Sequence, residues 1–121
     1  VLLAGFSQGA CLALEHAFTG RSSPDALIAF TGCRVGVSGD DHPANLPAAF
    51  PVYLTAGDAD PWIPVAAFAA TVAALGKAGA RLRADVFPGR QHEVSDAETA
   101  MLDGILADLA AGRAPRMEAP R

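Results

Sequence analysis

The chain has 121 residues, of which 51% are hydrophobic and 7% aromatic, and its formal net charge is −4. This size fits one domain, and the richness in Ala and Gly suits helices that pack closely on a parallel sheet. The mild acidity and the scattered arginines argue against a nucleic-acid partner, because phosphate binding needs a clustered basic surface.

The composition of the chain also argues against a membrane span and a metal site. No apolar run reaches the roughly 18–20 residues of a membrane span. Cys11 and Cys33 form neither a CxxC motif nor a Cys/His cluster, so we expect no metal site and interpret Cys11 as a buried free thiol. The chain begins abruptly inside an apolar run, so we expect upstream residues to be missing. We expect a cytoplasmic location, with a signal peptide left untested.

The first half of the chain predicts two strands with a helix between them. Residues 1–6 form an apolar run and predict a strand buried on both faces, as in a parallel sheet. Residues 10–18, rich in Ala and Leu, predict a helix, and residues 26–31 predict a second buried strand. Residues 32–50 contain Gly, Asp, Asn and Pro without any period, so we expect a long loop.

The second half continues the alternation of strand and helix. Residues 51–55 predict a third strand, and residues 82–87, in which apolar and charged side chains alternate, predict a fourth strand nearer the sheet edge. Pro64 opens the helix between them. Ser95 and Glu98 form a capping box that opens the final helix. The apolar stripe of this helix comprises Met101, Leu102, Ile105, Leu106 and Leu109.

This order predicts an α/β fold with a mostly parallel sheet of about four strands, right-handed crossovers and flanking helices. We expect the domain to span residues 1–112 and a disordered tail to occupy residues 113–121.

Residues 5–9 read Gly-Phe-Ser-Gln-Gly, a G-x-S-x-G motif between a predicted strand and a predicted helix. That context is typical of a nucleophile elbow. A serine on so sharp a turn has an unusual backbone angle, and we expect Gly5 and Gly9 to remove clashes there. The turn raises the Ser7 hydroxyl above the sheet and places the Gln8 N–H at a helix N-terminus, where it can stabilise an oxyanion. The alternative is a glycine-rich turn with a chance serine.

A nucleophilic serine needs a base, and the base needs an orienting acid; in hydrolases of this type the chain order is Ser, acid, His. His16 lies on the helix after the serine and faces away from it. His42 precedes every acid candidate that follows the third strand. We therefore choose His92, which follows the last strand at the edge where α/β sites are built.

Two carboxylates, Asp58 and Asp60, follow the third strand. Asp58 can cap the turn instead, a common role of aspartate. Asp60 precedes Pro61, which restrains its backbone toward an extended conformation. The residues by themselves favour Asp60 without excluding Asp58.

Three segments together resemble the phospholipase/carboxylesterase family of α/β-hydrolases, to which acyl-protein thioesterases and small bacterial carboxylesterases belong. They are AGFSQGA at 4–10, GDADPWIP at 57–64 and FPGRQH at 87–92. The resemblance extends from residue 1 to about residue 109. It implies a serine esterase or thioesterase in which Ser7 is the nucleophile, Asp60 the acid and His92 the base. The implied substrate is a small acyl ester or thioester, and no metal or cofactor takes part.

The resemblance also implies that Trp62 and Ile63 lie near the acyl pocket. The ordinary alternative for Trp62 is a partly buried packing aromatic. An imidazole base must be neutral, so activity is expected to fall as the pH drops through roughly 6–7.

Two departures from the family pattern affect these expectations. Family members carry further strands upstream, with a loop that supplies a second oxyanion N–H. We therefore expect an unpaired apolar edge at residues 1–6. We also expect weak or absent activity in the isolated chain, since losing one oxyanion donor typically costs roughly 10²–10³ in rate. Residues 33–49 replace a helix with a loop, either a short lid or a plain connection.

Two rival functions remain open. The chain could be a non-catalytic interaction module that keeps the fold, although the intact Ser7, Asp60 and His92 argue against this. It could also be a hydrolase of another branch, such as a peptidase. The oligomeric state is equally open, and a homodimer is one alternative.

Overall fold

A computed structural model describes residues 1–19, 24–33 and 46–118. The elements are β1 (Leu2–Phe6), α1 (Gln8–Thr19), β2 (Ala26–Phe30), β3 (Pro51–Gly57), α2 (Val65–Lys77), β4 (Arg81–Phe87) and α3 (Asp96–Ala110). All strand pairs are parallel, and the order in the sheet is β1-β2-β3-β4. The predicted α/β class is therefore confirmed, with β4 at a sheet edge as expected.

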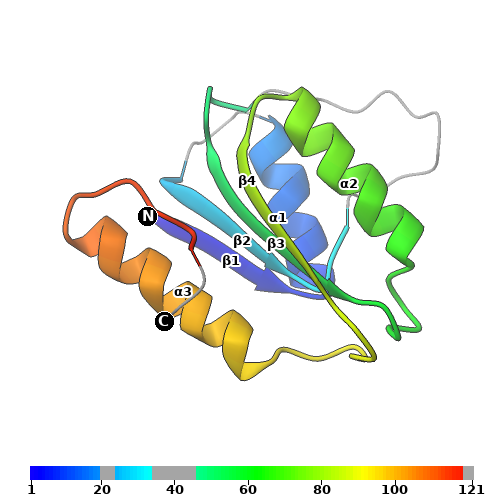
Figure 1. The fold of residues 1–121 in the computed structure, drawn as a ribbon. Helices are drawn as coiled ribbons and strands as arrows, with labels where there is room; N and C mark the ends of the chain where they lie inside the picture. Colours follow the sequence, from blue (N-terminus) through cyan, green and yellow to red (C-terminus); the bar gives the residue numbers. More distant parts are fainter. Residues whose placement is uncertain (20–23, 34–45, 119–121) are drawn as a thin grey trace.

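Helices cover both faces of the sheet: α1 and α2 pack on one face and α3 on the other (Figure 1). The alternation of side chains along each strand supplies both cores. In β2, Leu27 and Ala29 join the core with α1 and α2, whereas Ala26 and Ile28 join the core with α3. Every residue of β2 is consequently buried, as expected for a central strand of a parallel sheet.

β1 is less buried than the apolar run predicted. It pairs with β2 on one side and has no partner on the other among the described residues. None of its residues is fully buried, and Phe6 is 43% exposed. The prediction of burial on both faces is therefore wrong, and among the described residues β1 forms the predicted unpaired apolar edge.

The predicted capping box opens α3. The Glu98 N–H donates to the Ser95 hydroxyl over 3.4 Å, and the Ser95 N–H donates to the Glu98 carboxylate over 2.9 Å. Met101 and Ile105 of the predicted stripe are buried, but Leu106 is 44% exposed. The helix thus presents a narrower apolar face than the sequence suggested.

A charged residue, Asp108, is buried near the end of α3. Its carboxylate accepts hydrogen bonds from the Arg116 backbone N–H at 3.1 Å and from Arg113 Nη2 at 3.0 Å. These bonds lower the pKa of Asp108 to about 2. On β4, Arg81 and Arg83 donate to the carbonyls of Pro115 and Met117, respectively.

In the region of the predicted disordered tail, residues 113–118 contact buried and strand-borne charges of α3 and β4. The division into a domain at 1–112 and a tail at 113–121 stays a prediction. Residues 119–121 lie outside the described residues. Within the described part of the chain, no helix combines the length and the apolar character needed to cross a bilayer.

Candidate functional site

Ser7 forms the turn between β1 and α1. Its φ is 58°, in the left-handed region that residues other than glycine rarely adopt. The Ser7 N–H donates to the Phe30 carbonyl at 2.9 Å, and the Cys11 N–H donates to the Ser7 carbonyl at 3.1 Å. The end of β2 and the first turn of α1 thus hold this backbone in place. Gln8 is the first residue of α1, so its N–H has no acceptor within the helix.

The two glycines of the motif differ in their surroundings. A Cβ at Gly5 would lie 2.4 Å from the Gly9 carbonyl oxygen, whereas a Cβ at Gly9 would meet nothing within 4 Å. The expectation that both glycines remove a clash is therefore right for Gly5 and wrong for Gly9. The sharp turn requires glycine at position 5, because the backbone at the start of α1 lies where a side chain would be.

We predict that Gly5→Ala lowers the stability of the fold by about 1–3 kcal/mol, because the clashing atoms, the Gly9 carbonyl and the Ala10 nitrogen, belong to the backbone and cannot rotate away. The matched variant Gly9→Ala should keep or raise the melting temperature, since alanine favours a helix by about 1 kcal/mol over glycine. Thermal unfolding followed by circular dichroism measures both. A Gly5→Ala protein as stable as the wild type would contradict the clash.

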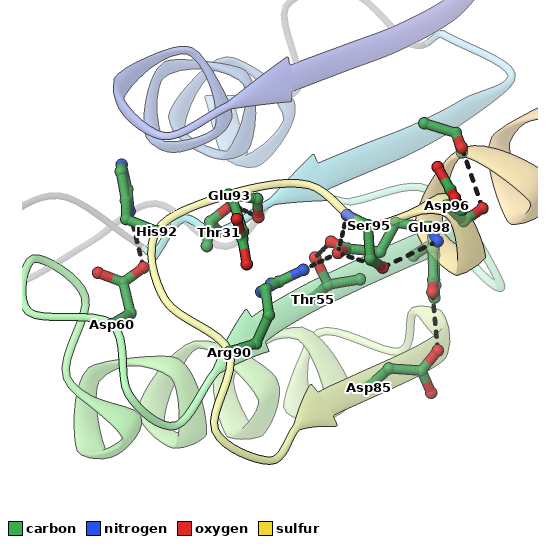
Figure 2. A network of polar contacts seen from close by, with 12 residues as sticks. Thr31, Thr55, Asp60, Asp85, Arg90, His92, Glu93, Ser95, Asp96 and Glu98 are labelled. Carbon is green, nitrogen blue, oxygen red and sulfur yellow. Dashed lines mark hydrogen bonds and ion pairs between the residues drawn. The ribbon is translucent and has the colours of Figure 1, made fainter.

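Three side chains meet at the carboxyl end of the sheet. His92 Nε2 lies 2.6 Å from Ser7 Oγ, and His92 Nδ1 lies 2.7 Å from Asp60 Oδ2. Ser7 follows β1, Asp60 follows β3 and His92 follows β4. Parallel strands end at one edge of a sheet, which brings these three loops together although they are far apart in the sequence. Figure 2 shows His92 and Asp60 facing each other across this edge.

The Asp60 carboxylate is fully buried and has hydrogen bonds at both oxygens. Oδ1 accepts the N–H groups of Trp62 at 2.7 Å and Ile63 at 3.1 Å, and Oδ2 faces His92. Burial raises the pKa of Asp60, but the hydrogen bonds with His92, Trp62 and Ile63 together outweigh it and leave the pKa below its ordinary value. An ionised carboxylate favours the tautomer with the proton on Nδ1, so that Nε2 can accept from Ser7.

The structure distinguishes the two candidate carboxylates. Asp58 is exposed, and its Oδ1 accepts the Gly89 N–H over 2.6 Å. It therefore joins the loop after β3 to the loop after β4, as a turn-forming aspartate does. Asp60, the favoured residue, is the one that contacts His92.

The contacts that hold Trp62 and Ile63 in the structure come from their backbone N–H groups. Both donate N–H groups to Asp60, and the Trp62 residue is 74% exposed. The alternative of a partly buried packing aromatic is wrong for Trp62, and acyl binding by the two residues remains a prediction. A cavity of about 330 Å³ lies elsewhere, between β4 and α3, with Asp85 and Met101 in its lining.

The remaining candidates lie apart from this contact. His16 is exposed on α1, and His42 falls outside the described residues, as does most of the loop at 33–49. Cys11 is only partly buried, which corrects the expectation of a buried thiol; its sulfur accepts the Cys33 N–H at 3.4 Å. Burial and the neighbouring Cys11 thiol raise the pKa of Cys33 to about 11.

Two further residues lie near the site, and the sequence alone does not single them out. The Phe6 ring lies 5.1 Å from the His92 ring, measured between centroids. Arg90 is buried two residues before His92. Both lie within the segments that resemble the family, at 4–10 and 87–92, but neither residue type by itself indicates a role.

The sequence profile of the phospholipase/carboxylesterase family matches residues 1–107. The chain belongs to this family. Solved structures agree with that assignment. A phospholipase/carboxylesterase from Dyadobacter fermentans is 34% identical, with a TM-score of 0.74 over 87% of this chain and 51% of its own. Esterase PE8 is 29% identical, with a TM-score of 0.72 over 88% of this chain and 48% of its own.

The carboxylesterase of Bacillus cereus shares the fold at 24% identity, with a TM-score of 0.70 over 83% of this chain and 46% of its own. The chain thus spans about half the length of these solved family structures. The search among curated proteins found no match.

Proposed function

We propose that the protein is a serine hydrolase that cleaves carboxylic esters or thioesters through an acyl-enzyme. The observation that carries this proposal is the continuous contact from Ser7 Oγ through the His92 ring to Asp60, with distances of 2.6 and 2.7 Å. A hydroxyl beside an imidazole that a buried carboxylate orients is the arrangement that makes serine nucleophilic. Membership of a phospholipase/carboxylesterase family supports acyl esters as the substrate class.

In the proposed reaction, His92 Nε2 accepts the Ser7 proton as Oγ attacks the carbonyl carbon. The Gln8 N–H at the start of α1 donates to the oxyanion that forms. The imidazolium then protonates the leaving alcohol or thiol, and the acyl group stays on Ser7. His92 next deprotonates a water molecule that releases the acid. Asp60 holds the ring and stabilises its charged form throughout.

The test uses the protein at its full natural length and compares acyl esters, acyl thioesters and peptides as substrates. We expect ester or thioester hydrolysis in the wild type, loss of that activity in His92→Ala, and wild-type rates in the matched control His16→Ala, whose imidazole is exposed on α1. A fluorophosphonate should add one phosphonyl group, located at Ser7 by peptide mapping. Hydrolysis of peptides alone, or ester hydrolysis that survives His92→Ala, would contradict the proposal.

A further inference from the structure

A buried ion pair lies beside the loop that carries His92. Arg90 Nη1 contacts Glu98 Oε1, and the two side chains are 8% and 0% exposed. Arg90 lies in the loop between β4 and α3, and Glu98 lies in the first turn of α3. Removing two charges from water costs free energy that their attraction offsets only when the geometry is well held. The contacts that hold each partner in place therefore decide whether this ion pair can be favourable.

Glu98 is fixed to two elements of the fold (Figure 2). Its Oε2 accepts a hydrogen bond from the Thr55 hydroxyl of β3. Its Oε1 accepts from the Ser95 backbone N–H at 2.9 Å and from the Ser95 hydroxyl at 3.0 Å. The carboxylate is thus a fixed acceptor that joins the sheet to the start of α3.

Arg90 is bound on its backbone side to the loop that carries Asp60. Its carbonyl accepts the Ala59 N–H at 3.1 Å. A Cβ at Gly57 would lie 2.1 Å from that carbonyl oxygen, so glycine there permits the approach. The guanidinium carbon lies 4.9 Å from the centroid of the Phe87 ring. Arg90 Nε, Nη1 and Nη2 make no hydrogen bond within the described chain, so the ion pair with Glu98 and the nearby carboxylates of Glu93 and Asp60 offset the buried charge.

The His92 ring contacts Ser7, Asp60 and Phe6, but within the described chain few contacts hold the backbone beside it. Its side chain is 19% exposed, and the neighbouring Glu93 carbonyl receives only a long hydrogen bond, 3.5 Å, from the Thr31 hydroxyl. The Arg90–Glu98 pair therefore supplies a strong attachment of the base-bearing loop to both the sheet and α3. Release of Arg90 from Glu98 would free the segment that sets where the imidazole lies.

We propose that Arg90 and Glu98 are positioning residues, which hold the His92 loop where the imidazole contacts Ser7 and Asp60 at once. This inference rests on the proposed function of His92 as the base. The ion pair touches neither the substrate nor the reacting atoms. It acts by fixing the backbone at residue 90, which both orients the loop after β4 and contacts the loop after β3.

The kinetic test compares Glu98→Gln, Arg90→Lys and a matched control, Glu93→Gln, in the full-length protein. Glu98→Gln keeps an acceptor for Ser95 but removes the buried charge. Glu93→Gln removes an exposed, solvent-screened charge that also attracts Arg90, so it controls for charge alone. We expect kcat of Glu98→Gln to fall about 10- to 100-fold, the effect of a displacement of about 1 Å at a catalytic group, with KM unchanged. Arg90→Lys should retain more activity, and Glu93→Gln all of it.

A second readout is the strongly downfield proton resonance expected from His92 Nδ1–H against Asp60, which needs no substrate. It should weaken or exchange faster in Glu98→Gln and persist in Glu93→Gln. If the wild type shows this proton resonance but hydrolyses no ester, the proposed function fails. The positioning role can then still be tested by comparing the resonance in Glu98→Gln with that in the wild type. A lower melting temperature with unchanged kcat and an unchanged proton would overturn the inference. If Glu98→Gln does not fold, the same criteria apply to Arg90→Lys.

Discussion

Replacing Ser7 by alanine should reduce kcat/KM for ester hydrolysis by about 10⁴- to 10⁶-fold and abolish fluorophosphonate labelling. Ser7 Oγ is the atom within 2.6 Å of His92 Nε2, and alanine leaves the imidazole without a hydroxyl to deprotonate. The residual rate would come from substrate binding and from the Gln8 N–H. Steady-state kinetics with the best ester of the substrate panel measures the loss.

Ser7→Gly provides a control that separates chemistry from folding. The φ of 58° strains any residue with a Cβ, by about 1–3 kcal/mol, and glycine removes that strain. Ser7→Gly should therefore lose as much activity as Ser7→Ala while its melting temperature rises above that of the wild type. Activity within tenfold of the wild type in either variant would show that Ser7 is not the nucleophile.

Replacing Asp60 by asparagine should lower kcat by about 10⁴-fold with little change in the overall fold. An amide can donate to the imidazole, which favours the wrong tautomer and no longer stabilises the imidazolium. Asp58→Asn is the matched control, because its exposed side chain keeps an oxygen acceptor for the Gly89 N–H. Equal losses in the two variants would assign the effect to the loop rather than to the carboxylate that contacts His92.

The lowered pKa of Asp60 also predicts how stability depends on pH. Its ordinary value is 3.8, and the folded value lies below it. The ionised carboxylate therefore contributes stability that is present above about pH 4 and is lost as the pH falls through the folded pKa. The difference in melting temperature between wild type and Asp60→Asn should shrink as the pH is lowered from about 7 toward about 3. A constant difference over that range would contradict the depressed pKa.

Local signals in the sequence were sufficient to predict the strands, the helices and the turn at Ser7. Each strand and helix follows from an apolar run or a period within a few residues. The Gly5 requirement and the Ser95–Glu98 capping box are likewise short-range, so both could be recognised before any coordinates. The sequence alone did not decide whether Asp58 or Asp60 is the partner of His92. The two carboxylates share one loop, and only the proline after Asp60 distinguishes them.

The tertiary structure alone decided which groups meet. Asp58 contacts Gly89, whereas Asp60 contacts His92, and this difference distinguishes the two carboxylates. Both contacts depend on how the loops after β3 and β4 lie across the sheet edge. The freedom at Gly9 and the exposure of Trp62 depend in the same way on neighbours distant in the sequence.

By itself, the sequence determined the alternating α/β elements, the strained serine turn and the set of side chains available for chemistry, because these follow from interactions within a few residues. The tertiary structure decided which carboxylate contacts His92 and that Arg90 is buried against Glu98. The physical reason is that hydrogen bonds and ion pairs between loops form only after parallel strands have brought their carboxyl ends to one edge. The order of the strands, not the spacing of residues along the chain, sets those distances.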